Sequence, residues 1–597
     1  IEHQHTDFPD RVSALRVAPD GKSAVFLKDT GGDENDQIFR LTLDPIPPKT
    51  GISPPPKVKP LTASPKVKNT LPVFDDTGSR IAYTSNARNG KDMDLFVADF
   101  SAKMPAGPDL GGEKAAGKPL VELTGSFSVA DFRGNQALVV EARSNVDQDL
   151  WVVDVKSKAK KLLTKHTGDE RWESARFSRD GKVIFALTDA GREFMSVVMV
   201  DVGTMKRVAL IEIDHDVTGL ALPRWSGARP KAKKGDPPSE LQAKTEDLLV
   251  YDLDVDGVEQ LEVLRLDDKR KKVESTGGVK NDLRGVISGI DVDPAGTVAY
   301  VSLERAEQPP EIYRVDLFTL QATRETQSDH AGVDEAKLVP AQLLSYKTFD
   351  GKPISFFWYA KAAAPGKKLP VVINVHGGPE AQAQPYWSGV TQYLALAGYA
   401  VAVPNVRGSL GYGKAFSHLD DKEKREDSVR DLSELGKFLA QRPDVDPKKL
   451  VLFGGSYGGY MVLAGLTLYP EQWAAGVDIV GIANFRTFLE QTAPYRRALR
   501  EAEYGSLATD GALLDKISPI HKVDKIAAPL MVIHGTRDPR VPIGEAMQIA
   551  AALKKRGLPV ELMTFEDEGH GLAKLKNRLI AYPAMVKFLD THVKSKP

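Results

Sequence analysis

The sequence contains no cysteine among its 597 residues. This absence excludes disulfide bonds, thiolate nucleophiles and metal sites built on thiolates. It does not fix the compartment, because a chain without thiols is indifferent to redox conditions. The chain begins with Ile1 rather than Met, and a removed signal peptide or a trimmed chain would both explain that start. We expect a periplasmic or secreted protein, with the cytoplasm as the alternative.

The chain also lacks an excess of either charge, since 80 Lys and Arg residues face 81 Asp and Glu residues. Net charge therefore gives no indication of a nucleic-acid or membrane-surface partner. No stretch approaches the roughly 20 apolar residues that span a bilayer. The length is too great for one ordinary domain, and the apolar fraction of 42 % is enough to bury two or more cores.

The first 330 or so residues repeat a short-strand pattern: a strand, a tight turn, a second strand, and a closing strand that ends in Asp. The turns fit a hairpin because Asp and Gly tolerate positive φ. They occur at Pro19-Asp20-Gly21-Lys22, Asp75-Asp76-Thr77-Gly78, Arg179-Asp180-Gly181-Lys182 and Asp293-Pro294-Ala295-Gly296. The closing strands recur about every 45 to 65 residues, which is typical of propeller blades.

Six copies of this pattern are visible, and a seventh is expected between Arg207 and Asp252, where the pattern is blurred. The sequence thus predicts an N-terminal β-propeller with seven blades; the alternative is a pair of β-sandwiches. Three stretches rich in Pro, Lys, Gly and Ala interrupt the strands and are expected to be solvated loops, at residues 45–68, 103–118 and 227–244.

From about Leu343 strands alternate with helical segments. Near-continuous apolar runs are expected to be buried strands at residues 369–375, 400–404, 450–453, 530–534 and 560–565, with helices at 390–397 and 428–441. This alternation predicts a parallel sheet covered on both faces, an α/β-hydrolase domain. We assign residues 1–335 to the propeller and 336–597 to the hydrolase domain, and expect the first ten or so residues to pack on the hydrolase domain.

Ser456 lies in Gly454-Gly455-Ser456-Tyr457-Gly458-Gly459, which matches the nucleophile elbow Gly-x-Ser-x-Gly. The elbow is a sharp strand-to-helix turn, so its flanking positions must lack bulky side chains. A strand is expected before the motif, at residues 448–453, and a helix after it, at 460–468. This context favours a nucleophile over a buried serine in a glycine-rich turn.

A serine hydroxyl needs a base, and His570 follows the expected strand 560–565, where an α/β-hydrolase places it. The base needs a carboxylate that orients it, and Asp538 follows the strand 530–534. The chain order Ser, Asp, His is the α/β-hydrolase order. For the oxyanion, we expect the backbone N–H of Tyr457 and that of Gly378, in His376-Gly377-Gly378-Pro379. This mechanism requires no metal and no cofactor.

These motifs together resemble the prolyl oligopeptidase family of serine peptidases. The resemblance covers about residues 343–593 and rests on His376-Gly377-Gly378-Pro379, Asn405-Val406-Arg407-Gly408-Ser409-x-Gly411-Tyr412-Gly413, Gly454-Gly455-Ser456-Tyr457-Gly458-Gly459-Tyr460, Gly535-Thr536-Arg537-Asp538 and Gly569-His570. The propeller half resembles the family only in architecture. Within the family the chain is similar to the acylaminoacyl-peptidase branch, because His376 stands where other branches have a tyrosine hydroxyl donor. Dipeptidyl peptidases of the family use an adjacent Glu-Glu pair, which this sequence lacks.

By the same resemblance, Ile482, Phe485 and Phe488 are expected to line an apolar S1 pocket, although ordinary core packing is the alternative. Arg496 and Arg497 follow closely and could bind a substrate carboxylate, because a guanidinium binds carboxylates in bidentate fashion. A plain surface helix is the alternative for these two arginines. A carboxylate clamp would make the protein a carboxypeptidase.

The sequence therefore predicts a serine peptidase of the acylaminoacyl-peptidase or oligopeptidase type that cleaves short peptides with an apolar P1 residue. The alternatives are a dipeptidyl aminopeptidase or carboxypeptidase of the same family, a carboxylesterase, and a catalytically silent propeller interaction protein. Short peptides are the expected partners, with no nucleic acid and no membrane. Blade edges in this family can pair between subunits, so a homo-oligomer is a further expectation from the resemblance.

Overall fold

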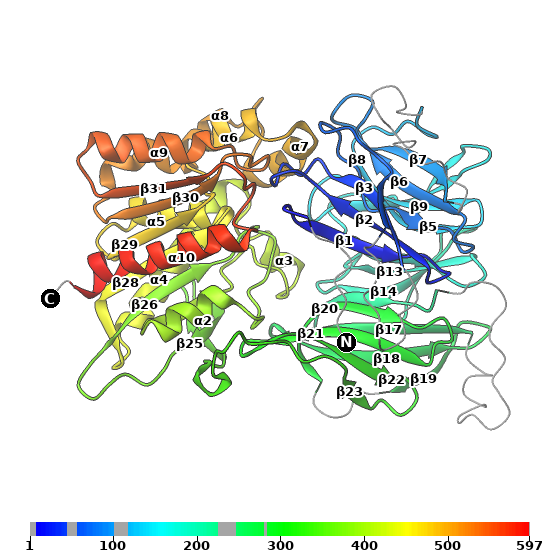
Figure 1. The fold of residues 1–597 in the computed structure, drawn as a ribbon, viewed down its shortest axis with the longest axis horizontal. Helices are drawn as coiled ribbons and strands as arrows, with labels where there is room; N and C mark the ends of the chain where they lie inside the picture. Colours follow the sequence, from blue (N-terminus) through cyan, green and yellow to red (C-terminus); the bar gives the residue numbers. More distant parts are fainter. Residues whose placement is uncertain are drawn as a thin grey trace.

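The computed structural model describes residues 8–43, 57–100, 118–224, 246–276, 278–279 and 283–595. Figure 1 shows two domains side by side, an all-β domain built from the first half of the chain and a layered α/β domain built from the second. Among the described helices, none combines the length and the apolar character that crossing a membrane would require.

The all-β domain consists of short antiparallel strands in six sequential units of three or four strands each, the last two of which are joined into one sheet by pairing of β18 with β20. The first three units hold β1 (Val12–Val17), β2 (Ser23–Lys28), β3 (Gln37–Thr42) and β4 (Lys57–Pro60); β5 (Val73–Phe74), β6 (Arg80–Ser85) and β7 (Asp94–Asp99); and β8 (Ser126–Arg133), β9 (Gln136–Ala142), β10 (Gln148–Asp154) and β11 (Lys160–Leu162). The last three hold β12 (Trp172–Phe177), β13 (Val183–Thr188), β14 (Ser196–Asp201) and β15 (Arg207–Ala209); β16 (Val217–Ala221), β17 (Asp247–Val255), β18 (Val258–Leu266) and β19 (Lys272–Thr276); and β20 (Arg284–Val292), β21 (Val298–Arg305), β22 (Gln308–Asp316) and β23 (Ala322–Arg324).

The predicted turns are present at the first hairpin of four units. Gly21, Gly78, Gly181 and Gly296 all have positive φ, between 67° and 72°. This is the backbone region that favours glycine, and it lets each first strand return at once as the second. The glycines therefore fix the start of the blade repeat.

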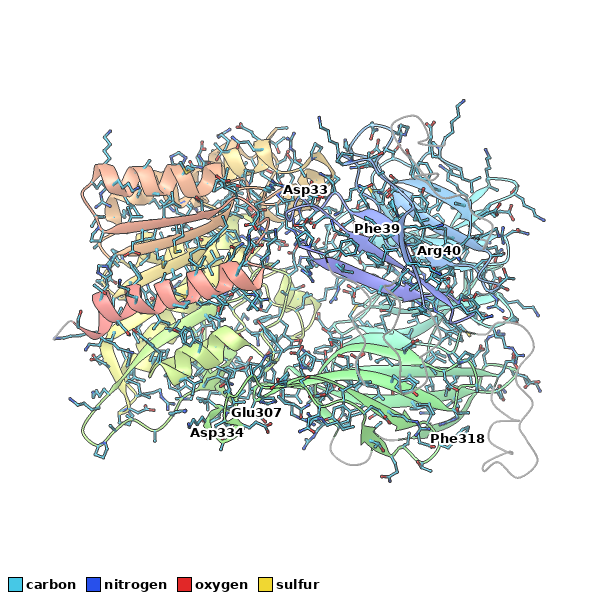
Figure 2. All side chains as sticks on the ribbon, viewed as in Figure 1. Asp33, Phe39, Arg40, Glu307, Phe318 and Asp334 are labelled. Atoms are coloured by element: carbon cyan, nitrogen blue, oxygen red, sulfur yellow. The ribbon has the colours of Figure 1, made fainter. Side chains whose placement is uncertain are left out.

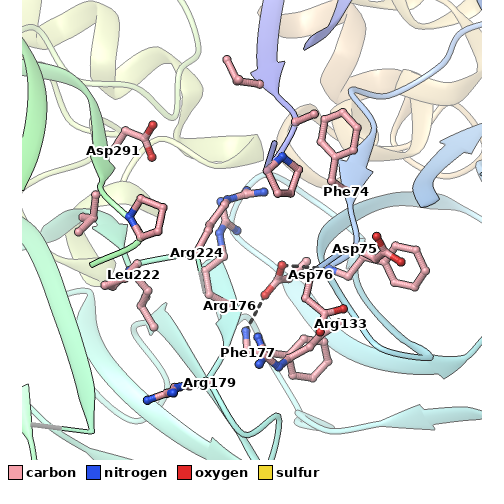
Figure 3. A pocket seen from close by; sticks show the side chains of 18 of the residues that line it. Phe74, Asp75, Asp76, Arg133, Arg176, Phe177, Arg179, Leu222, Arg224 and Asp291 are labelled. Carbon is pink, nitrogen blue, oxygen red and sulfur yellow. Dashed lines mark hydrogen bonds between the residues drawn. The ribbon is translucent and has the colours of Figure 1, made fainter. Parts of the chain in front are cut away.

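Residues at and just beyond the ends of the first strands of all six units line one cavity of about 240 Å³, together with the start of β17. In Figure 3, Arg176 and Arg224 reach into its middle, with Asp76, Arg133 and Asp291 around them. One cavity shared by every unit is the arrangement of blades around a propeller axis. The arginine side chains narrow this axis.

The described strands form six units rather than the seven expected. Residues 207–252 supply β15, β16 and the start of β17 instead of a separate unit, and residues 225–245 lie outside the described part. The predicted loop at residues 45–68 is wrong in part, because β4 pairs with β3 there. The predicted loops 103–118 and 227–244 lie outside the described residues, except for Lys118.

A single connection leads from β23 to the α/β domain. It contains the short 3-10 helix η1 (Glu335–Lys337), and the predicted boundary at residue 335 falls within it. Near the other end of the propeller, the Oδ1 atom of Asp10 lies 3.0 Å from Nζ of Lys574 in the α/β domain. Residues 1–7, for which packing on the hydrolase domain was also expected, lie outside the described residues.

The α/β domain has one sheet in the order β24-β25-β27-β26-β28-β29-β30-β31. All strands from β27 to β31 in this order are parallel, as predicted, and the first two are antiparallel additions. The strands are β24 (Gln342–Lys347), β25 (Pro353–Tyr359), β26 (Leu369–Val375), β27 (Ala400–Pro404), β28 (Val445–Gly455), β29 (Ala475–Ile479), β30 (Leu530–Gly535) and β31 (Val560–Phe565).

Helices cover both faces of this sheet. Neighbouring strand residues point to opposite faces, and the apolar side chains on each face pack against helices. On one face, Ile373 packs with residues of α4, α5 and α9; on the other, Val372 packs with residues of α2 and α10. The helices are α2 (Gly389–Leu396), α3 (Lys414–Ser417), α4 (Arg425–Ala440), α5 (Tyr457–Leu468), α6 (Phe485–Gln491), α7 (Pro494–Tyr504), α8 (Gly511–Ile517), α9 (Gly544–Lys555) and α10 (Leu575–Leu589), with the 3-10 turns η2 (Lys422–Lys424) and η3 (Pro519–Lys525) and the π-helical turn η4 (Asp590–Lys594). In Figure 1, α3 and α7 face the propeller.

Candidate active site

Ser456 occupies a strained turn between β28 and α5, with φ 59° and ψ −120°. The turn needs the neighbouring glycines. A Cβ on Gly458 would lie 2.1 Å from the carbonyl oxygen of Val375, and one on Gly454 would lie 2.5 Å from the carbonyl oxygen of Gly458. Strain of this kind persists only where the surrounding structure holds it, as at many functional sites. The strand, turn and helix predicted around Ser456 are therefore all present.

Asp538 and His570 come from the loops after β30 and β31. The Nδ1 atom of His570 lies 2.7 Å from Oδ2 of Asp538. The other carboxylate oxygen accepts hydrogen bonds from the backbone N–H groups of Arg540 and Val541, at 2.8 and 3.0 Å. The Asp538 side chain is fully buried, so these bonds fix its orientation toward the imidazole.

His534, at the end of β30, lies close to the same carboxylate, with Nε2 3.6 Å from Oδ2. Burial lowers the pKa of His534. Its Nε2 also lies 2.8 Å from the carbonyl oxygen of Val541, to which an Nε2–H can donate. His534 therefore packs beside Asp538 with its Nε2–H directed to Val541, and the Oδ2 atom of Asp538 is available to His570.

The two residues expected to supply oxyanion donors both lie close to Ser456. Tyr457 is the first residue of α5, and Gly378 lines the cavity that contains Ser456. The Tyr457 side chain is held away from this cavity, with its hydroxyl 2.9 Å from Oδ2 of Asp420 and 2.8 Å from Oγ of Ser428. His376 is buried, and its Nε2 lies 2.9 Å from Oγ of Ser409.

One cavity of about 140 Å³ joins the central residues. Ser456 and His570 line it, together with Asn145, Gly378, Ile482, Phe488, Arg496, Arg500, Tyr504, Arg540 and Val541. Three of the five predicted substrate-binding residues are in this set, namely Ile482, Phe488 and Arg496. Phe485 is not, because its ring is fully buried against Tyr460 and Tyr504, with ring centroids 4.9 and 4.7 Å away.

Arg497 does not line the cavity either. It lies on another side of α7 and donates to the carbonyl oxygen of Glu490 at 2.7 Å. The cavity residues that the sequence analysis missed are Asn145, Arg500, Tyr504, Arg540 and Val541. Helical spacing was the available signal for two of them, since Arg500 and Tyr504 follow Arg496 by four and eight residues on one helix face.

The propeller forms part of this site. The hairpin between β2 and β3 carries Glu34, whose carboxylate forms an ion pair with Arg540. Asn145, from the turn between β9 and β10, donates to the Glu380 carboxylate at 3.1 Å. Figure 2 labels Asp33, which lies on the β2–β3 hairpin at the boundary between the domains.

The same hairpin touches the loop that carries His570. A Cβ on Gly32 would lie 2.4 Å from the backbone nitrogen of Gly569, and one on Gly569 would lie 1.9 Å from the Gly32 carbonyl oxygen. Only glycine on both sides allows this backbone contact. The residue next to Gly569 is His570, so the propeller supports the base directly.

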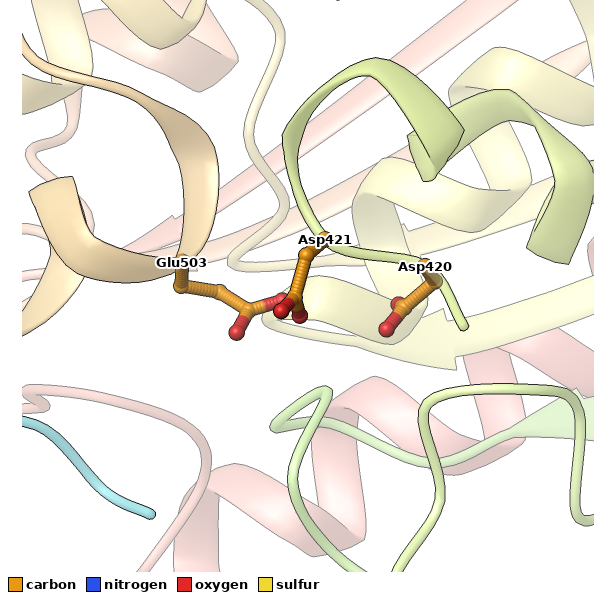
Figure 4. Close-up of side chains that lie close together, drawn as sticks. All are labelled: Asp420, Asp421 and Glu503. Atoms are coloured by element: carbon orange, nitrogen blue, oxygen red, sulfur yellow. The ribbon is translucent and has the colours of Figure 1, made fainter. Parts of the chain in front are cut away.

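A group of carboxylates lies behind the site. Asp420, Asp421 and Glu503 gather as Figure 4 shows, with oxygens within 4.8 Å of one another. The buried Arg425 guanidinium forms ion pairs with both Asp420 and Glu503. Because a cation of the chain already occupies this position, we assign the group as an ion-pair network that holds Tyr457, not as a metal site.

Comparisons with known proteins agree with this geometry. The sequence profile described as the prolyl oligopeptidase family matches residues 385–596. These residues make up most of the α/β domain, and over them the chain is similar to the prolyl oligopeptidase family. This match and the peptidase relatives identify the protein as a serine peptidase.

Relatives within the family have different names. The dipeptidyl aminopeptidase BIII of Pseudoxanthomonas mexicana is 28 % identical over 578 residues, which cover 93 % of this chain and 76 % of that protein. The acylamino-acid-releasing enzyme of Sus scrofa is 28 % identical over 314 residues, 51 % of this chain and 40 % of that enzyme. A puromycin-hydrolyzing peptidase of Mycobacterium tuberculosis has the same fold, with a TM-score of 0.78, 20 % identity, and coverage of 98 % of this chain and 95 % of that one.

Proposed function

We propose that the protein cleaves short peptides through an acyl-enzyme, with Ser456 as nucleophile, His570 as base and Asp538 as the group that orients the base. The observation that carries this proposal is the 2.7 Å contact between Nδ1 of His570 and Oδ2 of Asp538, beside a cavity that Ser456 and His570 both line. The contact leaves Nε2 of the imidazole to face the cavity and accept the serine proton.

In the first half of the reaction, the Ser456 oxygen attacks the peptide carbonyl while His570 takes the hydroxyl proton. The backbone N–H groups of Tyr457 and Gly378 stabilise the oxyanion, aided by the N-terminal end of α5. His570 then gives its proton to the leaving amine. In the second half, His570 activates a water molecule, which hydrolyses the ester and regenerates Ser456.

The size and position of the cavity support short substrates. Its volume is about 140 Å³, and both domains contribute to its wall. Ile482, Phe488 and Val541 supply apolar surface next to Ser456. We therefore propose an apolar P1 residue, because burying an apolar side chain against such a surface contributes about 1.5 to 3 kcal/mol.

The charges in the cavity bear on which end of the peptide is free. Its lining residues include three arginines and neither Asp nor Glu. A free ammonium group two residues from the scissile bond would need an acidic partner, and the nearby Glu34 and Glu380 already form ion pairs with Arg540 and Arg500. We propose an acylaminoacyl-peptidase or oligopeptidase type of activity on blocked or internal sequences. Dipeptidyl aminopeptidase activity is the second candidate, favoured by the relative that matches 93 % of the chain.

A pair of substrates that differ only in the amino terminus tests the proposal. We expect acetyl-Ala-Phe-anilide to be cleaved with a higher kcat/KM than Ala-Phe-anilide with a free amine. Ser456→Ala should lower kcat on both by about a thousandfold or more and abolish labelling by a fluorophosphonate. Faster cleavage of the free dipeptide anilide would favour the second candidate, and full activity of Ser456→Ala would refute the mechanism.

A further inference from the structure

The cavity beside Ser456 is rich in arginine. Arg496 and Arg500 enter it from α7, and Arg540 enters from the loop after Asp538. Among the described residues that line this cavity, none carries a carboxylate. Charged groups drawn from two separate elements thus converge on the space next to the nucleophile, and all of them are positive.

Two of these three guanidinium groups have a carboxylate partner, in each case a residue that does not itself line the cavity. Arg500 pairs with Glu380, with NH1 3.5 Å from Oε2, and both side chains are buried. Arg540 forms an ion pair with Glu34. Their charges are therefore largely neutralised before any substrate arrives.

Arg496 differs from both. In the described part of the chain, no ion pair and no hydrogen bond involves its guanidinium. Glu34, whose charge acts on Arg496, is shared by Arg540, the Tyr495 hydroxyl at 3.2 Å and Lys68 at 3.8 Å. Burial, Arg540 and Arg500 lower the pKa of Arg496. A positive charge in such surroundings is stabilised by an incoming anion.

The size of the cavity limits where that anion can lie. A cavity needs roughly 10 to 15 Å³ per water molecule by this measure, so 140 Å³ holds on the order of ten. An anion bound to Arg496 in this space lies within one or two residues of the carbonyl next to Ser456. A carboxylate suits the planar guanidinium because it can accept two parallel hydrogen bonds.

We propose that Arg496 is a specificity-determining residue that binds a substrate carboxylate within one or two residues of the scissile bond. The inference rests on the proposed peptidase function and adds a substrate class to it. The carboxylate has two sources, which share the same chemistry: the free C-terminus on the leaving side, or an acidic side chain on the acyl side. The first makes the enzyme a carboxypeptidase or a tripeptide-cleaving enzyme, and the second makes it selective for acidic peptides.

Two substrate pairs separate these sources, each an acid and its neutral isostere. The first pair is acetyl-Ala-Phe-Ala with a free carboxylate and the same peptide as its C-terminal amide. The second is acetyl-Glu-Phe-anilide and acetyl-Gln-Phe-anilide. For at least one pair, we expect the wild-type kcat/KM to favour the acid by about 10- to 100-fold, as charge-assisted hydrogen bonds do. The pair that responds identifies the source.

The variant Arg496→Met keeps much of the side-chain volume without the charge, and should bring the acid-to-neutral ratio close to one. Arg497→Met is the matched control, because this arginine lies next in sequence on the same helix but does not line the cavity. It should leave the ratio as in the wild type. A ratio near one for both pairs in the wild type, or an unchanged ratio in Arg496→Met, would overturn the proposal.

Failure of the underlying function has a different signature. In that case the wild type would cleave none of the four substrates and Ser456 would not react with a fluorophosphonate. Calorimetric binding of the acid and neutral tripeptides to the wild type and to Arg496→Met then decides the inference alone. Tighter binding of the acid that is lost in Arg496→Met supports the anion site, and equal binding of both peptides contradicts it.

Discussion

Asp478 is a buried carboxyl group packed closely against glycines behind the nucleophile. This buried residue is the last but one of β29, and a Cβ on Gly481 or Gly459 would lie 2.1 or 2.3 Å from its Oδ1 atom. Burial raises its pKa to about 7, and the nearby Glu545 adds to the effect. The folded protein thus holds a proton on Asp478 at pH values where an unfolded chain, with a pKa near 3.8, has lost it.

The sign of the resulting pH dependence is fixed. Because the folded-state pKa is raised, the stability that the protonated group contributes is present below about pH 4 and is lost as the pH rises through about 7. Asp478→Asn does not titrate and escapes this loss. The free energy of unfolding of the variant minus that of the wild type should therefore be larger at pH 8.5 than at pH 5, by on the order of 1 to 4 kcal/mol.

Thermal unfolding at the two pH values measures this difference. Comparing the variant with the wild type at each pH removes any effect of the amide that does not depend on pH. An identical difference in Tm at pH 5 and pH 8.5 would show that Asp478 ionises normally in the folded protein.

At the scale of elements, the hairpin between β2 and β3 has the largest influence on the site. It brings Gly32 onto Gly569 and Glu34 onto Arg540, so one short connection of the propeller contacts both loops that follow β30 and β31. Asp538 and His570 come from those two loops. The hairpin therefore determines how rigidly the base is positioned.

Gly32→Ala tests this role. Gly32 has φ 81°, and its new Cβ would lie 2.4 Å from the backbone nitrogen of Gly569, which must move together with His570. We expect kcat/KM for peptides to fall roughly 10- to 100-fold, because displacements of about 1 Å at a site have effects of this size.

Gly21→Ala is the control for backbone strain. Gly21 has a similar φ of 67° in the same blade, with no atom within 4 Å of an added Cβ. It should lose a comparable amount of stability and keep its activity. Equal activity of the two variants would contradict a role of the hairpin in positioning His570.

Local sequence signals predicted these elements well where burial is continuous. The strands β26 and β27 begin and end at the predicted residues, since each is a short apolar run in a sheet covered on both sides. The bounds of β31 also match, although it is an edge strand with partly exposed residues. The elbow around Ser456 was also predictable, because its glycines are demanded by close backbone contacts. Both signals reside within a dozen neighbouring residues.

The parts that could not be predicted depend on contacts between distant residues. Nothing near Glu34 or Asn145 indicates that they meet Arg540 and Glu380 of the other domain. Arg497 was grouped with Arg496 by adjacency, whereas a helix that begins at Pro494 places Arg500 on the cavity side instead. The number of blades depended on which strands pair within residues 207–252, and the sequence pattern in this region does not reveal the pairing.

At the scale of the molecule, the two domains meet through polar contacts. Gln384 donates to Glu259 at 3.1 Å, the backbone N–H of Trp387 donates to Glu304 at 3.0 Å, and Nζ of Lys414 lies 3.7 Å from Asp189. Polar interfaces of this kind are typical of domains that move relative to each other. Because arginine side chains line the cavity on the propeller axis, we expect a peptide to enter by separation of the domains.

A reversible cross-link tests this route. Lys414 donates to the backbone carbonyl of Asp169, and the chain has no native cysteine, so Asp169→Cys and Lys414→Cys give one unique pair. A bifunctional maleimide with a reducible spacer should lower peptide turnover by about tenfold or more, as expected where domain opening limits the rate. Reduction of the spacer should restore turnover.

Each single-cysteine variant, treated in the same way, accounts for effects of the reagent. Cross-linked protein that cleaves peptides at the rate of the reduced sample would show that substrates do not enter between the domains.

The glycine-to-glycine contact between the β2–β3 hairpin and the His570 loop links the position of the catalytic base to the closed arrangement of the two domains. If the domains separate to admit a peptide, this contact breaks. We then expect the peptide to be cleaved only after the domains close again. A folded protein between the separated domains would prevent closure, and the His570 loop would then lack its contact with the hairpin. Folded proteins are therefore expected to be poor substrates.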